Sequence, residues 1–354
     1  MATDPQVDLI FSHFIPRYIA TGVDANDINR LVAAIDDWSE WCREWSKVGA
    51  THEALANEAV AANRPVTAAQ AYVRAAICYH YGKHLFGAHP VEYREAHDAM
   101  MRCYRAAAKY DSRMEYLEIP YGSIKLRAWL RKPRTEGKPP VAIILPGLDA
   151  CKEELHEWSN AFLERGLATV TLDGPGQGEV AFDAAISPDW GKVIGAVIDF
   201  LQPRRDVDGE TVGIVGQSLG AIYAPLAAAF EPRLKACVAN CGPFNFGSVL
   251  PQMPTVSQDL FRIRARLDTI EQGHKYAGEL SLTNGRAEKI KCPLLVVFGA
   301  GDRIIPATEG EKLAKAAGGK VDFVVYEEGN HVCFNIPYKF RPLTADWMAE
   351  KLNG

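Results

Sequence analysis

Apolar side chains recur at helical spacing through the first third of the chain, where alanines and aromatic residues are frequent and strand patterns are few. The segments 67–86 and 91–110 predict two helices, joined by the turn signal Gly87-Ala88-His89-Pro90. A further helix is predicted from Asp27 to Val48, where the apolar positions are Ile28, Leu31, Ile35, Trp38, Trp41 and Trp45. The pattern has some likeness to a tetratricopeptide helix pair, but no repeat returns at a fixed period. Residues 1–112 are therefore expected to form a helical cap domain packed by ordinary helix contacts.

From Met114 onward the pattern changes to short apolar runs that are typical of strands. Alternation of such runs with helical segments favours an α/β fold with a parallel sheet, which we expect over residues 113–354. The segment 243–290 lies between two core strands and is too long for a simple connection, so it is interpreted as a lid insertion with helices near 257–267. The expected strands are Met114–Ile119, Ile124–Arg131, Val141–Leu145, Thr211–Val215, Cys292–Gly299 and Val321–Tyr326.

A glycine-flanked serine, Gly216-Gln217-Ser218-Leu219-Gly220, stands between the strand at 211–215 and a small-residue helix at 221–230. This strand, G-x-S-x-G and helix order is what the nucleophile elbow of an α/β-hydrolase requires. The glycines permit the sharp turn, because a Cβ at either position would collide with the neighbouring strand or helix. The context therefore predicts that Ser218 is a nucleophile.

The acid and the base are expected downstream in the order that this fold uses. Asp302 follows the buried strand at 292–299, and His331 follows the strand at 321–326. Loops at the carboxyl ends of parallel strands gather at one edge of the sheet, so Ser218, Asp302 and His331 are predicted to meet there as a catalytic triad. Two ordinary interpretations stand beside this one: Asp302 as a turn residue and His331 as a loop histidine. The rival acids Asp322, Glu327 and Glu328 belong to the histidine's own segment.

The oxyanion hole is predicted at two backbone N–H groups. Pro146-Gly147-Leu148-Asp149 leaves the strand at 141–145, which makes the N–H of Leu148 one candidate donor and that of Leu219 the other. Proline stands where ordinary esterases carry the histidine of a His-Gly pair. Lys152-Glu153-Glu154 is expected to open the next helix, and two acids in a first turn usually complement the helix dipole.

Composition indicates an ordinary globular protein. The chain has 354 residues, is 48% apolar and carries a formal net charge of −5, which gives no basic footprint for nucleic acid. No apolar run is long enough to span a bilayer, and the first eight residues lack a basic segment typical of a secretory signal. The eight cysteines show no metal-ligand spacing, so a reduced cytoplasm and no metal are expected. The run Gly174-Pro175-Gly176-Gln177-Gly178 is not interpreted as a phosphate loop, because it contains a proline, has no lysine and no helix follows it.

Several motifs together resemble the α/β-hydrolase family of C–C-bond hydrolases typified by 2,6-dihydroxypseudooxynicotine hydrolase, to which fungal polyketide-shortening pigment hydrolases are related. The resemblance covers nearly the whole chain and includes the helical N-terminal third. It implies a mostly parallel eight-stranded core with a helical cap and a lid after the sixth strand, a homodimer, and a cleft between cap and core. Ser218, Asp302 and His331 match the family's triad. The motifs that carry the resemblance are Pro146–Asp149, Lys152–Glu154, Asp173–Glu179, Gly216–Gly220 and Glu231–Leu234.

The resemblance implies hydrolysis of a C–C bond next to a ketone carbonyl, with no metal or organic cofactor. A small aromatic or polyketide-like molecule is the expected substrate, and Tyr79, Lys83 and Phe244 are candidate contacts to it. The enzyme that typifies the family carries an acidic residue in the segment corresponding to that after Gly242, whereas residues 244–250 here contain no carboxylate, so the substrate is expected to differ. A carboxylesterase with the same triad and a non-catalytic ligand receptor remain as alternatives.

Overall fold

The computed structural model describes residues 4–354 and divides the chain into two compact units, Met1–Glu115 and Tyr116–Gly354. Positions 1–3 lie outside the described residues, and the predictions for the extreme N-terminus fall there in part. The division falls inside the first strand, three residues beyond the predicted domain end at 112.

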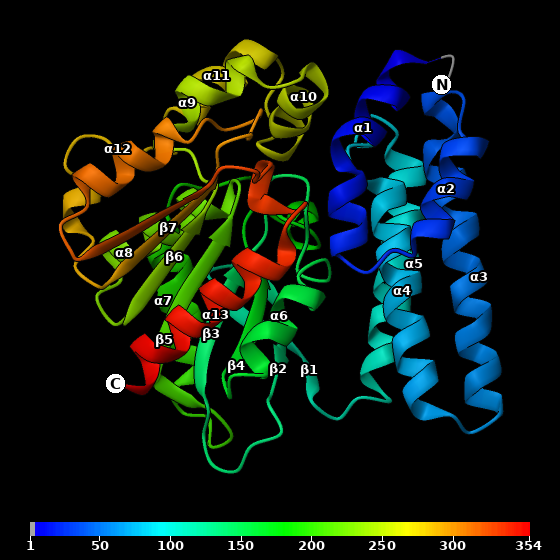
Figure 1. The fold of residues 1–354 in the computed structure, drawn as a ribbon, viewed down its shortest axis with the longest axis horizontal. Coiled ribbons are helices and arrows are strands. Elements are labelled where there is room, and N and C mark those ends of the chain that lie inside the picture. Colours follow the sequence, from blue (N-terminus) through cyan, green and yellow to red (C-terminus); the bar gives the residue numbers. More distant parts are fainter. Residues whose placement is uncertain (1–3) are drawn as a thin grey trace. The chain divides into compact units, whose positions relative to one another are not determined.

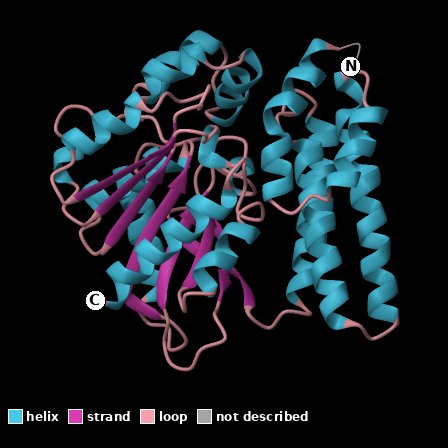
Figure 2. Ribbon diagram, in the orientation of Figure 1, coloured by secondary structure: helices cyan, strands magenta, loops and turns pink. Residues whose placement is uncertain are grey.

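The N-terminal unit is helical up to Ala108 (Figure 2). Its central helix α4 packs against both α3 and α5, and the three run side by side (Figure 1). Aromatic side chains fill its interior: the rings of Tyr18, Trp45 and Tyr81 lie 4.5–5.5 Å apart between centroids. Such tilted and edge contacts are favoured by the ring quadrupoles. The helices are α1 (Pro5–Ala20), α2 (Ala25–Ala34), η1 (Trp38–Glu40), α3 (Trp41–Ala61), α4 (Pro65–Lys83) and α5 (Pro90–Ala108).

The single helix predicted from Asp27 to Val48 is wrong. Helix α2 ends at Ala34, Ile35 is extended, and the carboxylate of Asp37 accepts a hydrogen bond from the N–H of Ser39 before α3 begins. An aspartate that binds the backbone two residues on favours a break, and this local bond outweighs the helical spacing of the apolar residues. The spacing persists because both helices bury their apolar faces in one core.

The second unit contains an eight-stranded sheet in the order β1-β2-β4-β3-β5-β6-β7-β8, so the predicted mostly parallel eight-stranded fold is confirmed. Strand β2 pairs with β4 antiparallel, and every described pair from β4 through β3 to β8 is parallel. The central strands are buried from end to end, which explains their continuous apolar sequences. The strands are β1 (Met114–Tyr121), β2 (Ile124–Arg131), β3 (Pro140–Leu145), β4 (Ala168–Asp173), β5 (Asp208–Gln217), β6 (Ala236–Asn240), β7 (Leu294–Gly299) and β8 (Val321–Tyr326).

Helices cover both faces of this sheet (Figure 1). Helices α6 (His156–Leu163) and α13 (Pro337–Asn353) contact each other on one face, where Met348 packs against Gly213 of β5. Helices α7 (Trp190–Leu201), α8 (Gly220–Phe230) and α12 (Thr308–Ala316) lie on the other, and Gly310 of α12 contacts Phe298. The carboxyl ends of the parallel strands remain open for loops.

The predicted insertion between β6 and β7 is helical as expected. It contains α9 (Phe246–Val249), η3 (Leu250–Gln252), α10 (Thr255–Arg264), α11 (Ile270–Ala277) and η4 (Ala287–Lys289). Helix α11 begins with a reciprocal capping box between Thr269 and Gln272. Among the described residues, no helix is long and apolar enough to cross a membrane, and the cysteines form no disulfide.

Candidate active site

Ser218 stands on a strained turn between β5 and α8. Its φ is +53°, and its N–H donates to the carbonyl of Asn240 at 2.9 Å. A Cβ on Gly216 would lie 2.0 Å from the carbonyl oxygen of Gly220, and one on Gly220 would lie 2.5 Å from that of Leu145. The two glycines are therefore required for the elbow, and the turn leaves the Ser218 side chain partly exposed at the end of the strand.

The structure brings the three predicted residues together. Ser218 Oγ lies 2.9 Å from His331 Nε2, and His331 Nδ1 lies 2.7 Å from Asp302 Oδ2. The Asp302 side chain is fully buried and that of His331 is 9% exposed. Both contacts have hydrogen-bond length, so a proton has an unbroken path from the serine to the imidazole, whose other nitrogen faces a carboxylate.

The loops hold Asp302 and His331 in these positions. The second carboxylate oxygen of Asp302 accepts the N–H groups of Ile304 and Ile305 at 2.8 and 2.9 Å, which prevents rotation of the carboxylate. The residue after the histidine, Val332, has a φ of +60°, and its carbonyl accepts a bond from the Asn240 side chain at 3.3 Å. Asn240 thus supports both the serine turn and the histidine loop from the end of β6.

The two N–H groups predicted to form the oxyanion hole belong to buried residues close to Ser218 in the chain or in the fold. Leu148 and Leu219 are buried, and within the described residues neither N–H donates to an acceptor. Gly147 lies directly against the serine, because a Cβ there would be 3.1 Å from Ser218 Cβ. Buried N–H groups are rarely left unpaired, so a pair beside a nucleophile is an arrangement suited to an oxyanion.

The peptide groups on either side of the Leu148 N–H are held by buried side chains that the sequence analysis did not single out. Gln177 Nε2 donates to the carbonyl of Pro146 at 2.7 Å, and the Arg264 guanidinium donates to that of Leu148. Gln177 comes from the glycine-rich loop after β4 and Arg264 from the last residue of α10. The amide of Gln177 lies within the Asp173–Glu179 motif, so this motif could have identified the residue from the sequence. No local sequence pattern marks Arg264.

Lys152, Glu153 and Glu154 do not open a helix, because α6 begins only at His156. The Lys152 Nζ instead lies 2.9 Å from Glu153, 2.9 Å from Asp173 and 3.1 Å from Glu179, and the lysine side chain is fully buried. Burial opposes the charged ammonium, but these carboxylates raise the pKa of Lys152 well above its usual value. We define the Lys152 cluster as Lys152, Glu153, Asp173 and Glu179. It connects the turn after Leu148 to the loop after β4.

The three candidate substrate contacts lie in separate surroundings. Tyr79 packs against Gly49 and its hydroxyl donates to Glu53 at 2.9 Å, within the helical unit. Lys83 is buried with its Nζ 5.3 Å from the centroid of the Tyr93 ring. Phe244 is half-buried, and its N–H donates to Glu309 Oε2 at 2.9 Å. A carboxylate from α12 thus supports the segment in which the sequence has none, and the substrate-binding roles stay predictions.

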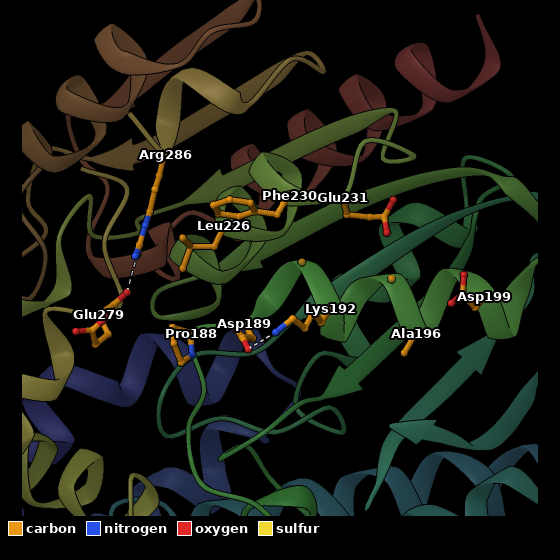
Figure 3. Close-up of a pocket in the computed structure, with 12 residues that line it drawn as sticks. Pro188, Asp189, Lys192, Ala196, Asp199, Leu226, Phe230, Glu231, Glu279 and Arg286 are labelled. Carbon is orange, nitrogen blue, oxygen red and sulfur yellow. Dashed lines mark hydrogen bonds and ion pairs between the residues drawn. The ribbon is translucent and has the colours of Figure 1, made fainter. Parts of the chain in front are cut away.

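A separate groove of about 770 Å³ lies at the far end of α8 from Ser218 (Figure 3). It is bordered by Lys192 and Asp199 of α7, Phe230 of α8, and Glu279 and Arg286 of the insertion. Phe230 follows Gly220 by ten residues, which places this groove about 15 Å from the elbow along the helix. It contains none of the predicted catalytic residues. The described residues contain no group of three or more His, Cys, Asp or Glu side chains suited to a metal ion.

Comparison with known proteins identifies the family to which the chain belongs. The family model described as FrsA-like, "Esterase FrsA-like", matches residues 37–352. The chain is 29% identical to 2,6-dihydropseudooxynicotine hydrolase of Paenarthrobacter nicotinovorans over 95% of this chain and 91% of that protein. It is 33% identical to 20-hydroxy-prefusarin hydrolase of Gibberella moniliformis over 75% and 74% of the two chains.

A solved structure supports the fold at full length. The crystal structure of 2,6-dihydroxy-pseudo-oxynicotine hydrolase superposes with a TM-score of 0.87 and 28% identity over 95% of each chain. The resemblance deduced from the sequence motifs is thereby confirmed. Since the family model spans almost the whole chain, this protein belongs to the FrsA-like esterase family and is a hydrolase with the α/β-hydrolase fold.

Proposed function

We propose that this hydrolase cleaves a C–C bond next to a ketone carbonyl, in an aryl ketone or a β-diketone, with Ser218 as nucleophile. The observation that carries the proposal is the continuous row of hydrogen bonds from Ser218 Oγ through His331 to Asp302, together with two buried N–H groups near the serine that have no described acceptor. The choice of bond rests on the motifs shared with the C–C-bond hydrolases and on full-length similarity to a pseudooxynicotine hydrolase.

In the first half-reaction His331 Nε2 accepts the Ser218 proton while Oγ attacks the carbonyl carbon. The N–H groups of Leu148 and Leu219 stabilise the oxyanion of the tetrahedral intermediate. Asp302 holds the imidazole in the required tautomer and stabilises its protonated form. When the intermediate collapses, the C–C bond breaks and His331 returns the proton to the departing carbon. A polyhydroxylated ring or a 1,3-diketone carbon suits this step, because either stabilises the developing carbanion.

In the second half-reaction water attacks the acyl-serine. His331 accepts a proton from the water, the oxyanion forms again at the same two N–H groups, and the ester bond to Ser218 Oγ breaks. The serine recovers its proton from His331. The net reaction adds one water and gives a carboxylic acid and a carbon product that carries a new hydrogen, so no oxidant, metal or organic cofactor is consumed.

Carboxylester hydrolysis is the second candidate. It is favoured by the description of the matching family as esterase. The same groups perform it with an alkoxide as leaving group, which needs less stabilisation than a carbanion. The two reactions therefore differ in the leaving group and not in the roles of Ser218, Asp302 and His331.

A substrate panel separates the two candidates. We would compare kcat/KM for trihydroxyacetophenone, benzoylacetone and p-nitrophenyl acetate, and follow the reaction in ¹⁸O-labelled water. The proposal expects ketone cleavage in which the carboxylic acid gains one oxygen from water. Ser218→Ala serves as the control and should remove this product.

Ester hydrolysis without cleavage of either ketone would favour the esterase. Turnover of no probe, together with failure of a fluorophosphonate to label Ser218 in the folded protein, would contradict both candidates. Labelling of Ser218 without turnover would contradict the proposed substrate class while leaving the nucleophile in place. The fluorophosphonate thus tests whether Ser218 is the nucleophile, and the substrate panel tests which bond is cleaved.

The candidate substrate contacts in the helical unit are part of the same proposal. Removing a side chain that contacts only the substrate raises KM and leaves kcat nearly unchanged. We therefore expect this pattern for Lys83→Met and Tyr79→Phe. An unchanged KM in both folded variants would contradict the predicted contacts.

A further inference from the structure

The insertion between β6 and β7 is joined to the loop after β4 at the end of helix α10. Helices α10 and α11 lie beyond the carboxyl ends of the parallel strands (Figure 1). The carbonyl of Arg264 accepts the N–H of Ile186 at 3.1 Å, and the Arg266 guanidinium donates to the carbonyl of Phe182 at 2.9 Å. From α11, the Tyr276 hydroxyl donates to the carbonyl of Ile186 at 2.8 Å. Several bonds therefore hold this helix end in one place.

One side chain of the same helix end reaches the turn that carries a predicted oxyanion donor. We refer to this turn, Pro146–Asp149, as the β3 turn. The Arg264 side chain is buried, and its guanidinium donates to the carbonyl of Leu148 within the β3 turn. Burying a guanidinium is costly unless its donors are hydrogen-bonded, so this bond is part of how the insertion packs on the sheet. The insertion thus contacts the β3 turn through a charged group of fixed direction.

The β3 turn needs support from outside because it contains Gly147. A Cβ at this position would lie 3.1 Å from Ser218 Cβ, so the close approach to the elbow favours glycine. Glycine in turn leaves the adjoining peptide groups freer to rotate than any other residue would. The peptide group that carries the Leu148 N–H follows Gly147 directly. Gln177 holds the peptide group before it, and Arg264 holds the one after it, so the N–H lies between two fixed groups.

We propose that Arg264 is a positioning residue, through which the insertion sets the direction of the Leu148 N–H and completes the oxyanion hole. The inference rests on the proposed function, because it takes this N–H as an oxyanion donor. A backbone donor stabilises a developing oxyanion only when it already points at the place where the charge forms. Loss of the Arg264 bond should therefore slow the step that forms the oxyanion and leave ligand binding nearly unchanged.

Phosphonylation of Ser218 by a fluorophosphonate tests the oxyanion hole without a known substrate. The phosphonyl oxygen takes the place of the oxyanion, so the maximal rate constant of labelling reports on the donors, whereas the half-saturating concentration reports on binding. We expect Arg264→Met to lower this rate constant at least about tenfold with little change in the half-saturating concentration. Arg264→Lys keeps a cationic donor and should restore the rate constant to within about threefold of wild type.

Arg266→Met is the matched control. Arg266 ties the same helix end to the loop after β4 and, among its described bonds, makes none to the β3 turn, so labelling should stay within about twofold of wild type. An equal fall in both methionine variants would overturn the inference, because docking of the insertion would then matter and not the bond to Leu148. A wild-type rate constant in folded Arg264→Met, or no restoration by Arg264→Lys, would overturn it too. Failure to label wild type would instead overturn the proposed nucleophile, and the inference with it.

A crystal structure of phosphonylated wild type is the second measurement, and it does not depend on the folding of any variant. We expect the phosphonyl oxygen to accept a hydrogen bond from the Leu148 N–H while the Arg264 guanidinium remains on the Leu148 carbonyl. A guanidinium bound directly to the phosphonyl oxygen would make Arg264 a catalytic residue and overturn the positioning role. Release of the guanidinium from the carbonyl in the adduct would also overturn it. Circular dichroism shows whether each variant used for labelling is folded.

Discussion

Two polar clusters lie near strand ends in the same α/β unit, and they differ in what they leave unpaired. In the row of Ser218, His331 and Asp302, the serine is partly exposed and two buried N–H groups beside it have no described acceptor. In the Lys152 cluster the ammonium has three N–H donors and three carboxylates within 3.1 Å, and the lysine has no exposed surface. Charged and buried residues alone therefore do not distinguish a reactive site from a structural one.

The difference follows from the cost of burying polar groups. An ammonium ion in a protein interior is tolerated only when acceptors replace its water, and the Lys152 cluster supplies them. The two N–H groups near Ser218 instead have no described acceptor. In the proposed mechanism they become paired only when a reacting oxygen arrives, which is the condition for stabilising a transition state in preference to the ground state. Substitutions in the two clusters should accordingly affect different properties.

The largest expected effect is on turnover in Ser218→Ala. In the proposed mechanism the serine forms the covalent intermediate, so we expect kcat to fall by about 10⁴- to 10⁶-fold while the unfolding midpoint in urea changes little. Steady-state kinetics on any accepted substrate, with an unfolding curve, measure both. Activity within tenfold of wild type would mean that another residue is the nucleophile.

Asp302→Asn should lower kcat by about 10⁴-fold, because the amide favours the wrong imidazole tautomer. The substitution keeps the shape of the side chain, and its Oδ1 can still accept the N–H groups of Ile304 and Ile305. Stability should therefore remain close to wild type. A small loss of kcat, or a different carboxylate at His331 Nδ1 in a crystal structure, would contradict the assignment.

Lys152→Met should act mainly on stability. Removing the ammonium leaves buried carboxylates without their counter-charge, and breaking a buried pair typically costs about 3–5 kcal/mol. Chemical denaturation measures the free energy of unfolding. The matched control is Lys192→Met, since Lys192 forms a 2.9 Å ion pair with Asp189 but is 75% exposed, so its loss should change the free energy of unfolding far less. Equal losses in the two variants would remove the distinction between the clusters.

Gln177→Met should give the smallest effect of the four substitutions. Gln177 is a buried structural residue, as Lys152 is, but its loss should lower turnover, as the loss of Ser218 does. The thioether fills the space but cannot donate to Pro146, so the peptide group next to the one that carries the Leu148 N–H loses one support. We expect kcat to fall about 10- to 100-fold with KM nearly unchanged, as when an oxyanion donor is weakened. Gln252→Met is the control, because Gln252 makes a similar backbone bond at an exposed position. A change in KM alone would show that Gln177 acts on substrate binding.

The sequence by itself determined the local geometry of the nucleophile and the order of the fold. Gly216 and Gly220 predict the elbow because only glycine fits beside the backbone there, and the range of β8 agrees with the structure from Val321 to Tyr326. Buried parallel strands and sharp turns leave such signals because the constraint acts within a few residues. The proximity of Ser218, His331 and Asp302 was predictable as well, since strand ends in a parallel sheet converge at one edge.

Only the tertiary structure decided contacts between segments that are distant in sequence. Arg264 reaches Leu148 across 116 residues, and Glu309 holds the backbone of Phe244 across 65. Lys152 becomes a buried cation because Asp173 and Glu179 approach it from another loop, whereas its own neighbours indicated the first turn of a helix. No periodicity or motif records which distant partner satisfies a polar group, because that pairing depends on how complete strands and helices pack.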